Sequence, residues 1–257
     1  MIIAGVDVGN KATKAVLIDE GRKVLSWALM NTRGDIDKLG ELVIGMAAEK
    51  AGLKSADIVR VVATGAGGKE IKFTKEYFTS TLCSCVGSSE LFPAVEVGID
   101  IGAEECRVFR GSGKGDVIDF FINDKCAAGV GMFIEIMAKA LDVPLEEVGA
   151  LSLKYSKELP LSTSCVVFAE SEVISLINEG ESREDVMRAI HIVAAMKAAG
   201  LLRKVGAAKK FVVTGGVALN IGFLDCLKNA IDLDLLVPEN PQIVGAFGAA
   251  LLAQRRK

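Results

Sequence analysis

Short apolar runs separated by turn residues open the chain and predict a strand-rich first segment. Each run has the length and the alternation of a β-strand. A longer stretch with apolar residues at helical spacing follows, and then one more strand that ends at a glycine-rich turn. The elements expected here are strands at 2–8, 13–19 and 23–30, a helix at about 35–52, and a strand at 59–64.

The same order of elements returns in the second half of the chain. Three short strands come first again, and helices follow them. The expected elements are strands at 95–101, 105–110 and 116–122, helices at about 127–141, 166–179 and 183–205, a strand at 211–214, a helix near 217–230, a strand near 233–237, and a final helix from Pro241 through Ala253. Proline in the first turn is typical of a helix start.

A repeated motif connects the two halves. Gly5-Val6-Asp7-Val8-Gly9 and Gly98-Ile99-Asp100-Ile101-Gly102 share an apolar-Asp-apolar-Gly pattern, and each opens a set of strands. We therefore predict an α/β fold of two duplicated lobes, residues 1–94 and 95–257, with a cleft between them. The final helix is the element of the second lobe that could pack back on the first.

Composition and charge favour a compact cytoplasmic protein. Of the 257 residues 51% are hydrophobic and only 5% are aromatic, while glycine occurs 27 times, which is typical of α/β packing with close backbone contacts. The net charge of −3 and the lack of a Lys/Arg-rich run argue against nucleic acid as a partner. The N-terminus enters a strand at once and no apolar run approaches a membrane span, so we expect no membrane association.

The first hairpin has the parts of a phosphate-binding loop. Asp7 stands at a strand end and is followed by glycine and small polar residues, so its carboxylate can hold a metal-bound water while backbone N–H groups hold a phosphate. Lys11 or Lys14 could neutralise phosphate charge, and Thr13 offers a hydroxyl. A single Asp-x-Gly is a weak signal, but two copies, at Asp7 and Asp100, could clamp a nucleotide from both lobes. Nucleotide binding is the favoured interpretation.

A third feature supports nucleotide binding, and two common nucleotide-binding motifs are absent from the sequence. The strand that ends at Thr214 runs into Gly215-Gly216, where the missing side chains let a flat base or ribose approach. The sequence contains no GxxxxGK[ST] and its first strand–helix unit has no GxGxxG, so neither a P-loop nor a Rossmann site is expected. His191 lies in an apolar helix, as core and surface histidines do, and we assign it no role.

Two of the six cysteines differ from the others in position. Cys126 and Cys165 each precede an expected helix, and the positive end of a helix lowers a thiol pKa and favours an anionic cluster. The residues alone leave open a reactive thiol or a plain helix-start cysteine. The remaining cysteines are expected to be packing residues: Cys83, Cys85, Cys106 and Cys226.

A [4Fe–4S] cluster takes four thiolates, so one chain with two such cysteines supplies too few. A two-fold dimer would bring Cys126 and Cys165 of each subunit to one axis and complete the set. Four helix N-termini would then point at one cluster, which would also help to hold the dimer together.

Four stretches carry a resemblance to a known family: Asn123-Asp124-Lys125-Cys126-Ala127-Ala128-Gly129, the run CVVFAESEVIS at 165–175, Thr214-Gly215-Gly216-Val217-Ala218, and Gly245-Ala246-Phe247-Gly248-Ala249-Ala250. In them, and over nearly its whole length, the chain resembles the activators of 2-hydroxyacyl-CoA dehydratases and the ATP-binding subunits of benzoyl-CoA reductases. The resemblance implies an actin-like ATPase (ribonuclease H-like) fold, a homodimer, and one [4Fe–4S] cluster held by Cys126 and Cys165 of both subunits.

The resemblance also implies an activity. In such proteins a ferredoxin or flavodoxin reduces the cluster, and ATP binding or hydrolysis moves the cluster-bearing helices so that the electron reaches a partner enzyme. Asp7 and Asp100 would be the catalytic residues that orient Mg²⁺ or the attacking water. The residues expected to contact the nucleotide are Gly9, Asn10, Lys11, Ala12, Thr13, Lys14, Gly102, Ala103, Glu104, Gly129, Gly131, Gly215, Gly216, Val217 and Gln242.

The second hairpin departs from the family pattern. Many dehydratase activators have Gly-Gly-Gln-Asp after the second Asp-Ile, whereas this chain has Gly102-Ala103-Glu104-Glu105. The change affects the nucleotide contacts of that loop. It argues against the dehydratase branch and favours a benzoyl-CoA reductase or a double-cubane cluster protein as the partner, although a dehydratase stays among the three expected partners. A paralogous heterodimer is an alternative to the homodimer.

Two other functions of the same superfold remain as alternatives. One is a small-molecule or acyl kinase, which would need a dedicated carboxylate in a substrate pocket, and the sequence shows no such acid beyond Asp7 and Asp100. The other is a non-catalytic actin-like scaffold that binds ATP, which would not require Cys126 and Cys165.

Overall fold

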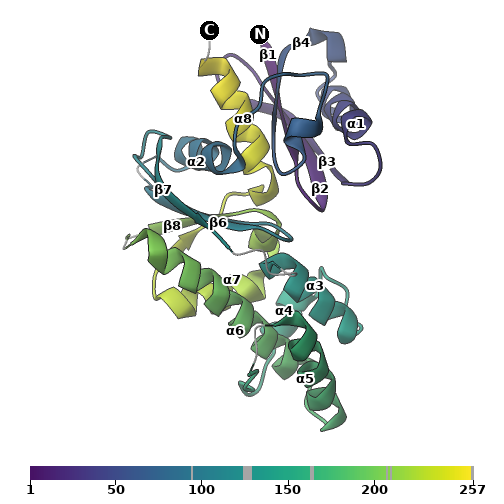
Figure 1. Cartoon of the computed structure of the whole chain (residues 1–257), viewed down its shortest axis with the longest axis vertical. Helices are drawn as coiled ribbons and strands as arrows, with labels where there is room; N and C mark the ends of the chain where they lie inside the picture. The colour runs from purple at the N-terminus through teal and green to yellow at the C-terminus, as the bar shows by residue number, and fades with distance from the viewer. Residues whose placement is uncertain (94, 124–128, 163–164, 207, 209, 256–257) are drawn as a thin grey trace. The chain divides into compact units, whose positions relative to one another are not determined.

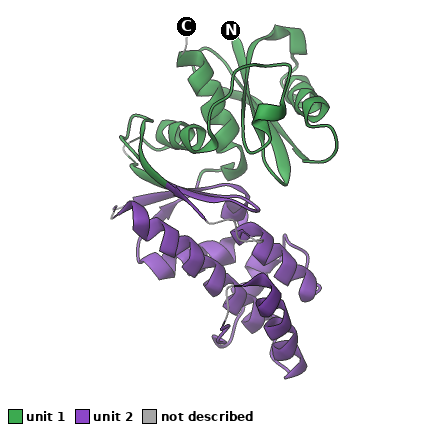
Figure 2. Ribbon diagram, in the orientation of Figure 1, with its two compact units in different colours: residues 1–98, 109–120, 238–257 green, residues 99–108, 121–237 purple. Residues whose placement is uncertain are grey.

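The computed structural model describes residues 1–93, 95–123, 129–162, 165–206, 208 and 210–255. The chain forms two compact units, shown in different colours in Figure 2. Unit 1 consists of residues 1–98, 109–120 and 238–257, and unit 2 of residues 99–108 and 121–237. The C-terminal segment therefore belongs to the same unit as the N-terminus.

A four-stranded sheet in the order β3-β2-β1-β4 forms the centre of unit 1. β1 (Ile2–Val8) pairs antiparallel with β2 (Ala12–Ile18) and parallel with β4 (Ile58–Thr64), while β3 (Val24–Asn31) pairs antiparallel with β2. Most residues of β1 and β2 are buried, as expected for strands covered on both faces.

Helices cover both faces of this sheet. Ala4, Val6 and Val8 of β1 pack with α1 (Ile36–Lys50), and Ile3, on the other face, packs with α8 (Val244–Arg255). α2 (Ser80–Leu91) lies against α8 (Figure 1). The backbones touch here, because a Cβ added at Gly248 would overlap the carbonyl oxygen of Cys83.

The second sheet has five strands in the order β7-β6-β5-β8-β9. Its first four strands repeat the order of the first sheet, which agrees with the duplicated motif at Asp7 and Asp100. β8 pairs parallel with β9. The strands are β5 (Val97–Ile101), β6 (Cys106–Gly111), β7 (Val117–Ile122), β8 (Lys210–Thr214) and β9 (Asp234–Leu236).

α6 is the central helix of unit 2. It starts at Arg183, after Ser182 has capped it by accepting from the Asp185 N–H, and it is buried on almost every turn. It contacts the other helices of the unit (Figure 1). α6 spans Arg183–Leu202, and the helices around it are α3 (Val130–Ala140), α4 (Val148–Ser152), α5 (Val166–Asn178) and α7 (Ile221–Ile231).

The predicted helix boundaries differ from the structure in places that local hydrogen bonds explain. The helix predicted near 217–230 is a short 3₁₀ turn at Gly216–Leu219 followed by α7, because the Asn220 side chain accepts from the Phe223 N–H and starts a new helix. α8 likewise begins at Val244, after a 3₁₀ turn at Pro241–Ile243. No helix in the described ranges is long and apolar enough to cross a bilayer.

Candidate functional site

The β1–β2 pairing places Asp7 opposite Lys14. Lys14 Nζ lies 3.2 Å from Asp7 Oδ2, and the two side chains are only 15% and 17% exposed. Ion pairs that are partly shielded from water are screened less than surface pairs. The first predicted site acid and one of the predicted phosphate-neutralising lysines therefore form a pair, with part of each still accessible.

The loop between these strands is held by hydrogen bonds of its own. Gly9 N donates to Ala12 O at 3.0 Å, and Thr32 Oγ1 donates to Gly9 O at 2.7 Å. Thr13 is fully buried, and its hydroxyl lies 2.9 Å from that of Thr32. In this structure the Thr13 hydroxyl supports the turn, and Asn10 and Lys11 lie at its exposed tip.

Two glycines that the sequence did not identify as site residues surround the Asp7 carboxylate. A Cβ added at Gly65, whose φ is +92°, would lie 2.5 Å from Asp7 Oδ1, and one added at Gly245 would lie 3.4 Å from Asp7 Oδ2. Gly65 follows β4 and Gly245 lies in the first turn of α8. A side chain at Gly65 would crowd the carboxylate, whereas a Cβ at Gly245 would lie at ordinary contact distance, so Gly65 is the glycine that keeps space open beside Asp7. Gln242 lies just before α8.

The second hairpin repeats the turn of the first. Gly102 N donates to Glu105 O at 2.8 Å, as Gly9 N does to Ala12 O. Asp100, on β5, is half-buried, and Glu104 at the turn is exposed. The side chain of Glu105, one of the residues that departs from the family pattern, pairs with Arg107. With this sequence the second hairpin has the same turn hydrogen bond as the first and an ion pair beside it.

The start of α3 packs on this second hairpin, backbone against backbone. A Cβ at Gly131 would lie 2.5 Å from Gly102 O, and one at Gly129 would overlap the backbone of Glu104. On the other side of residues 124–128, Asn123 Nδ2 donates to Glu104 O at 3.1 Å. The described residues that flank 124–128, Asn123 and Gly129, therefore both contact this hairpin. Cys126 itself lies outside the described residues.

The diglycine turn also packs against the end of β5. Gly215 has a φ of +88°, and a Cβ there would overlap the carbonyl oxygen of Ile101. Val217 lies against the start of α3, because a Cβ added at Gly131 would be 3.1 Å from Val217 Cγ2. Unit 2 therefore brings together three segments that the sequence assigned to the nucleotide: the second hairpin, the start of α3 and the diglycine turn.

Cys165 lies at an exposed helix start, a position compatible with metal ligation. It is exposed, it is the N-cap residue of α5, and it makes no capping hydrogen bond with its side chain. Ligation by sulfur at a helix N-terminus is favourable because the helix dipole stabilises negative charge there. Of the two predicted cluster ligands, only Cys165 is among the described residues, and its position is compatible with an iron–sulfur cluster. Within those residues, no group of three or more His, Cys, Asp or Glu side chains could hold a metal ion.

The other described cysteines are packing residues, as predicted. Burial raises the thiol pKa of Cys83 to about 12, that of Cys85 to about 11 and that of Cys226 to about 11. Burial also raises the pKa of Cys106 well above its ordinary value. Burial of these four side chains fits their predicted packing role.

His191 is a core histidine, one of the two possibilities that the sequence left open. Its side chain is fully buried. Nδ1 lies 2.8 Å from Ser152 Oγ, and Nε2 lies 2.9 Å from Asn220 Nδ2. Burial and, to a smaller extent, the charge of Arg188 lower its pKa to about 3.

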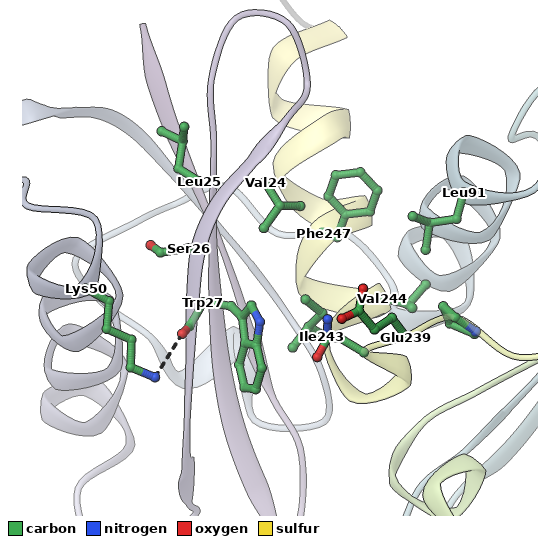
Figure 3. Close-up of a pocket in the computed structure, with 12 residues that line it drawn as sticks. Val24, Leu25, Ser26, Trp27, Lys50, Leu91, Glu239, Ile243, Val244 and Phe247 are labelled. Carbon is green, nitrogen blue, oxygen red and sulfur yellow. Dashed lines mark hydrogen bonds between the residues drawn. The ribbon is translucent and has the colours of Figure 1, made fainter.

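A separate hollow in unit 1 involves none of the predicted site residues. It measures about 600 Å³ and is open to solvent (Figure 3). Lys50 lies at its edge with Nζ 3.3 Å from Trp27 O and 5.4 Å from the centre of the indole ring. Its lining residues are Val24, Leu25, Ser26, Trp27, Lys50, Leu91, Pro238, Glu239, Asn240, Ile243, Val244 and Phe247.

Known proteins of similar sequence match the chain over nearly its full length. The activator of lactoyl-CoA dehydratase from Anaerotignum propionicum is 37% identical over 253 residues, covering 98% of this chain and 97% of the relative. One of the benzoyl-CoA reductase subunits from Thauera aromatica is 35% identical over 261 residues, covering 97% of this chain and 92% of the relative.

Solved structures confirm the predicted actin-like ATPase fold. The activator of the 2-hydroxyisocaproyl-CoA dehydratase from Clostridium difficile with bound ADPNP superposes with a TM-score of 0.94 at 33% identity, covering 99% of this chain and 95% of that one. A ROK-family glucokinase from Streptomyces griseus, at 15% identity and a TM-score of 0.63 over 99% and 100% of the chains, shares the fold alone. Residues 4–253 match the family model, and the chain therefore belongs to the BadF/BadG/BcrA/BcrD ATPase family.

Proposed function

We propose that this chain is a cytoplasmic ATP-hydrolysing electron-transfer protein that delivers low-potential electrons to a partner enzyme. The partner is a 2-hydroxyacyl-CoA dehydratase, a benzoyl-CoA reductase or a double-cubane cluster protein, and a ferredoxin or flavodoxin is the electron donor. Relatives named as a dehydratase activator and a reductase subunit support this role. The observation that carries it is Cys165, an exposed cysteine at a helix start in a chain whose other described cysteines are buried.

The nucleotide would bind between two lobes, residues 1–94 and 95–257, with Mg²⁺. Asp7 and Asp100 would orient the metal or the attacking water, and the two hairpins would hold the phosphates. The matching turns at Gly9 and Gly102 support this arrangement. So does the space that Gly65 leaves beside Asp7. A relative's structure with bound ADPNP supports ATP as the nucleotide.

A [4Fe–4S] cluster would be held by Cys126 and Cys165 of two subunits, and when bound it supplies a one-electron carrier. The surface of α5 supports a dimer at this place. Val167, Phe168 and Ile174 are 66%, 67% and 47% exposed, and large apolar side chains that gather at a surface mark interaction sites. A homodimer with two copies of α5 at its axis would cover them, and a paralogous heterodimer could do the same.

The decisive experiment is iron and acid-labile sulfide analysis of the protein purified without oxygen. We expect about four iron atoms and four sulfides per dimer, and loss of both in Cys165→Ser and in Cys126→Ser. Cys85→Ser is the matched control, because Cys85 is buried and its thiol already bonds to the Asp116 carbonyl oxygen. A wild-type protein without metal, or a Cys165→Ser variant with a full iron content, would refute the proposed function.

A further inference from the structure

One face of α6 carries three buried polar side chains. Asp185, Arg188 and His191 are three residues apart, so they lie along the same side of the helix. They are only 2%, 3% and 0% exposed. Charged side chains are rarely buried to this extent unless they are paired, and each of the three has partners outside α6.

At the His191 end of this face, Asn220 connects α6 to the Gly216–Leu219 turn. Asn220 Nδ2 lies 2.9 Å from His191 Nε2, and Asn220 follows the Gly216–Leu219 turn directly and caps α7. Because the buried imidazole is neutral, Asn220 donates to Nε2 and the Nδ1–H donates to Ser152 Oγ. The Ser152 hydroxyl in turn donates to Gly149 O at 3.1 Å. Every polar atom of this network therefore has a partner, which fixes the turn relative to α6.

Arg188, in the middle of the face, connects α7 to the segment after α4. Its Nη1 lies 2.6 Å from Asp225 Oδ2 on α7. Its guanidinium lies 4.4 Å from the centre of the Tyr155 ring, and its Nε is 3.6 Å from Glu158 Oε1. That last distance is too long for a hydrogen bond, and the buried Nε has no hydrogen-bond partner. The contact with α7 is tight, and the contact with Glu158 has room to tighten.

Asp185 anchors the same segment to the first turn of α6. Its Oδ1 accepts from Ser156 N at 2.6 Å and from Lys157 N at 3.1 Å. The other end of the segment is attached to α5, where Glu172 Oε1 accepts from Ser162 N at 2.9 Å. Residues 155–162 are therefore held by α6 at one end and by the helix that Cys165 caps at the other.

We propose that Asp185, Arg188 and His191 are positioning residues that couple the nucleotide state of the Gly216–Leu219 turn to the position of Cys165. The inference rests on the proposed function, which assigns this turn to the nucleotide and Cys165 to the cluster. A shift of the turn moves Asn220 and α7, and Asp225 on α7 is bonded to Arg188. Arg188 then changes its contacts with Tyr155 and Glu158, and the segment that leads to Cys165 follows. Coupling of this kind needs packed elements with two discrete arrangements. The structure shows one arrangement, with Arg188 Nε 3.6 Å from Glu158 Oε1, and the second would be one in which these two atoms form a hydrogen bond.

Hydrogen–deuterium exchange of the anaerobically purified protein tests this, with and without the Mg²⁺ complex of a non-hydrolysable ATP analogue. In the wild-type protein we expect the analogue to change amide exchange in residues 155–162 by about fivefold or more, the lower end of typical allosteric coupling. In Arg188→Met this change should vanish, while the dissociation constant of the analogue stays within about twofold of the wild-type value. Lys157→Ala is the matched control, because Lys157 lies in the same segment but makes an exposed ion pair with Glu181, and it should respond like the wild type.

A second variant protects the test against misfolding of Arg188→Met. Tyr155→Leu combined with Glu158→Gln removes the contacts on the segment side and leaves the Arg188–Asp225 ion pair in place, so it should lose the same response. A normal response in either variant would overturn the inference, and so would a wild-type protein that binds the analogue without any change in residues 155–162. A wild-type protein that binds no nucleotide would instead contradict the proposed function, and the inference would fail with it.

Discussion

The imidazole of His191 is fully buried between Ser152 and Asn220, and this burial makes the stability of the protein depend on pH. The folded-state pKa is lowered to about 3 from the ordinary 6.5. The unfolded chain therefore takes up a proton below pH 6.5 that the folded chain excludes. The stability from this group is fully present above pH 6.5 and is lost progressively as the pH falls toward 3, by about 1.4 kcal/mol per pH unit.

His191→Gln removes the titrating group, so its stability should not share this pH dependence. We expect the wild-type protein to exceed the variant in free energy of unfolding by a larger margin at pH 7.5 than at pH 5.5. The difference between the two margins should be about 1 kcal/mol. Urea unfolding of both proteins at the two pH values measures it. A margin that stays constant between pH 7.5 and 5.5 would show that His191 is not held neutral in the folded protein.

Elements were easier to predict than the contacts between them. The strands around Asp7 and Asp100, and helix starts such as the one at Cys165, follow from local patterns of apolar and turn residues. The proximity of Gly245 to Asp7 does not, because no local pattern pairs residues so far apart in the chain. The break before α7 was missed for a related reason. The signal was Asn220, which is a favourable N-cap, but an unbroken apolar pattern concealed it.

The Asn220 side chain caps α7 and donates a hydrogen bond to His191, and two substitutions separate these roles. Asn220→Ser keeps a capping oxygen for the Phe223 N–H but loses the donor to His191, whereas Asn220→Ala loses both. We expect Asn220→Ala to lower the free energy of unfolding by about 1 kcal/mol more than Asn220→Ser, the typical value of an N-cap. Both should raise the KM for ATP, because both free the Gly216–Leu219 turn from α6. Urea unfolding and steady-state ATPase kinetics measure the two effects. Equal stability of the variants would show that the cap contributes nothing.

On the scale of the whole molecule, the duplication is visible in two sheets that share one strand order and in two hairpins that share one turn. The sequence motif at Asp7 and Asp100 was sufficient to predict it. The same motif could not show that residues 238–257 belong to unit 1, because α8 is held there by contacts of small residues such as Gly248 with Cys83. Such contacts depend on shape, which an apolar pattern does not encode.

The exposed apolar side chains of α5 should also determine the oligomeric state. Phe168 is 67% exposed one turn from Cys165, so the proposed dimer would bury it near the axis, where truncation of an aromatic side chain has a large effect on binding. We expect Phe168→Ser to raise the dimer dissociation constant about tenfold or more. Sedimentation equilibrium without oxygen measures this constant. Leu42→Ser is the matched control, because Leu42 is 52% exposed on α1, far from both Cys126 and Cys165 in the sequence, and it should leave the constant unchanged. If both substitutions weaken the dimer equally, or neither does, the two copies of α5 do not meet at the axis, and Cys165 would have to find its remaining ligands in another way.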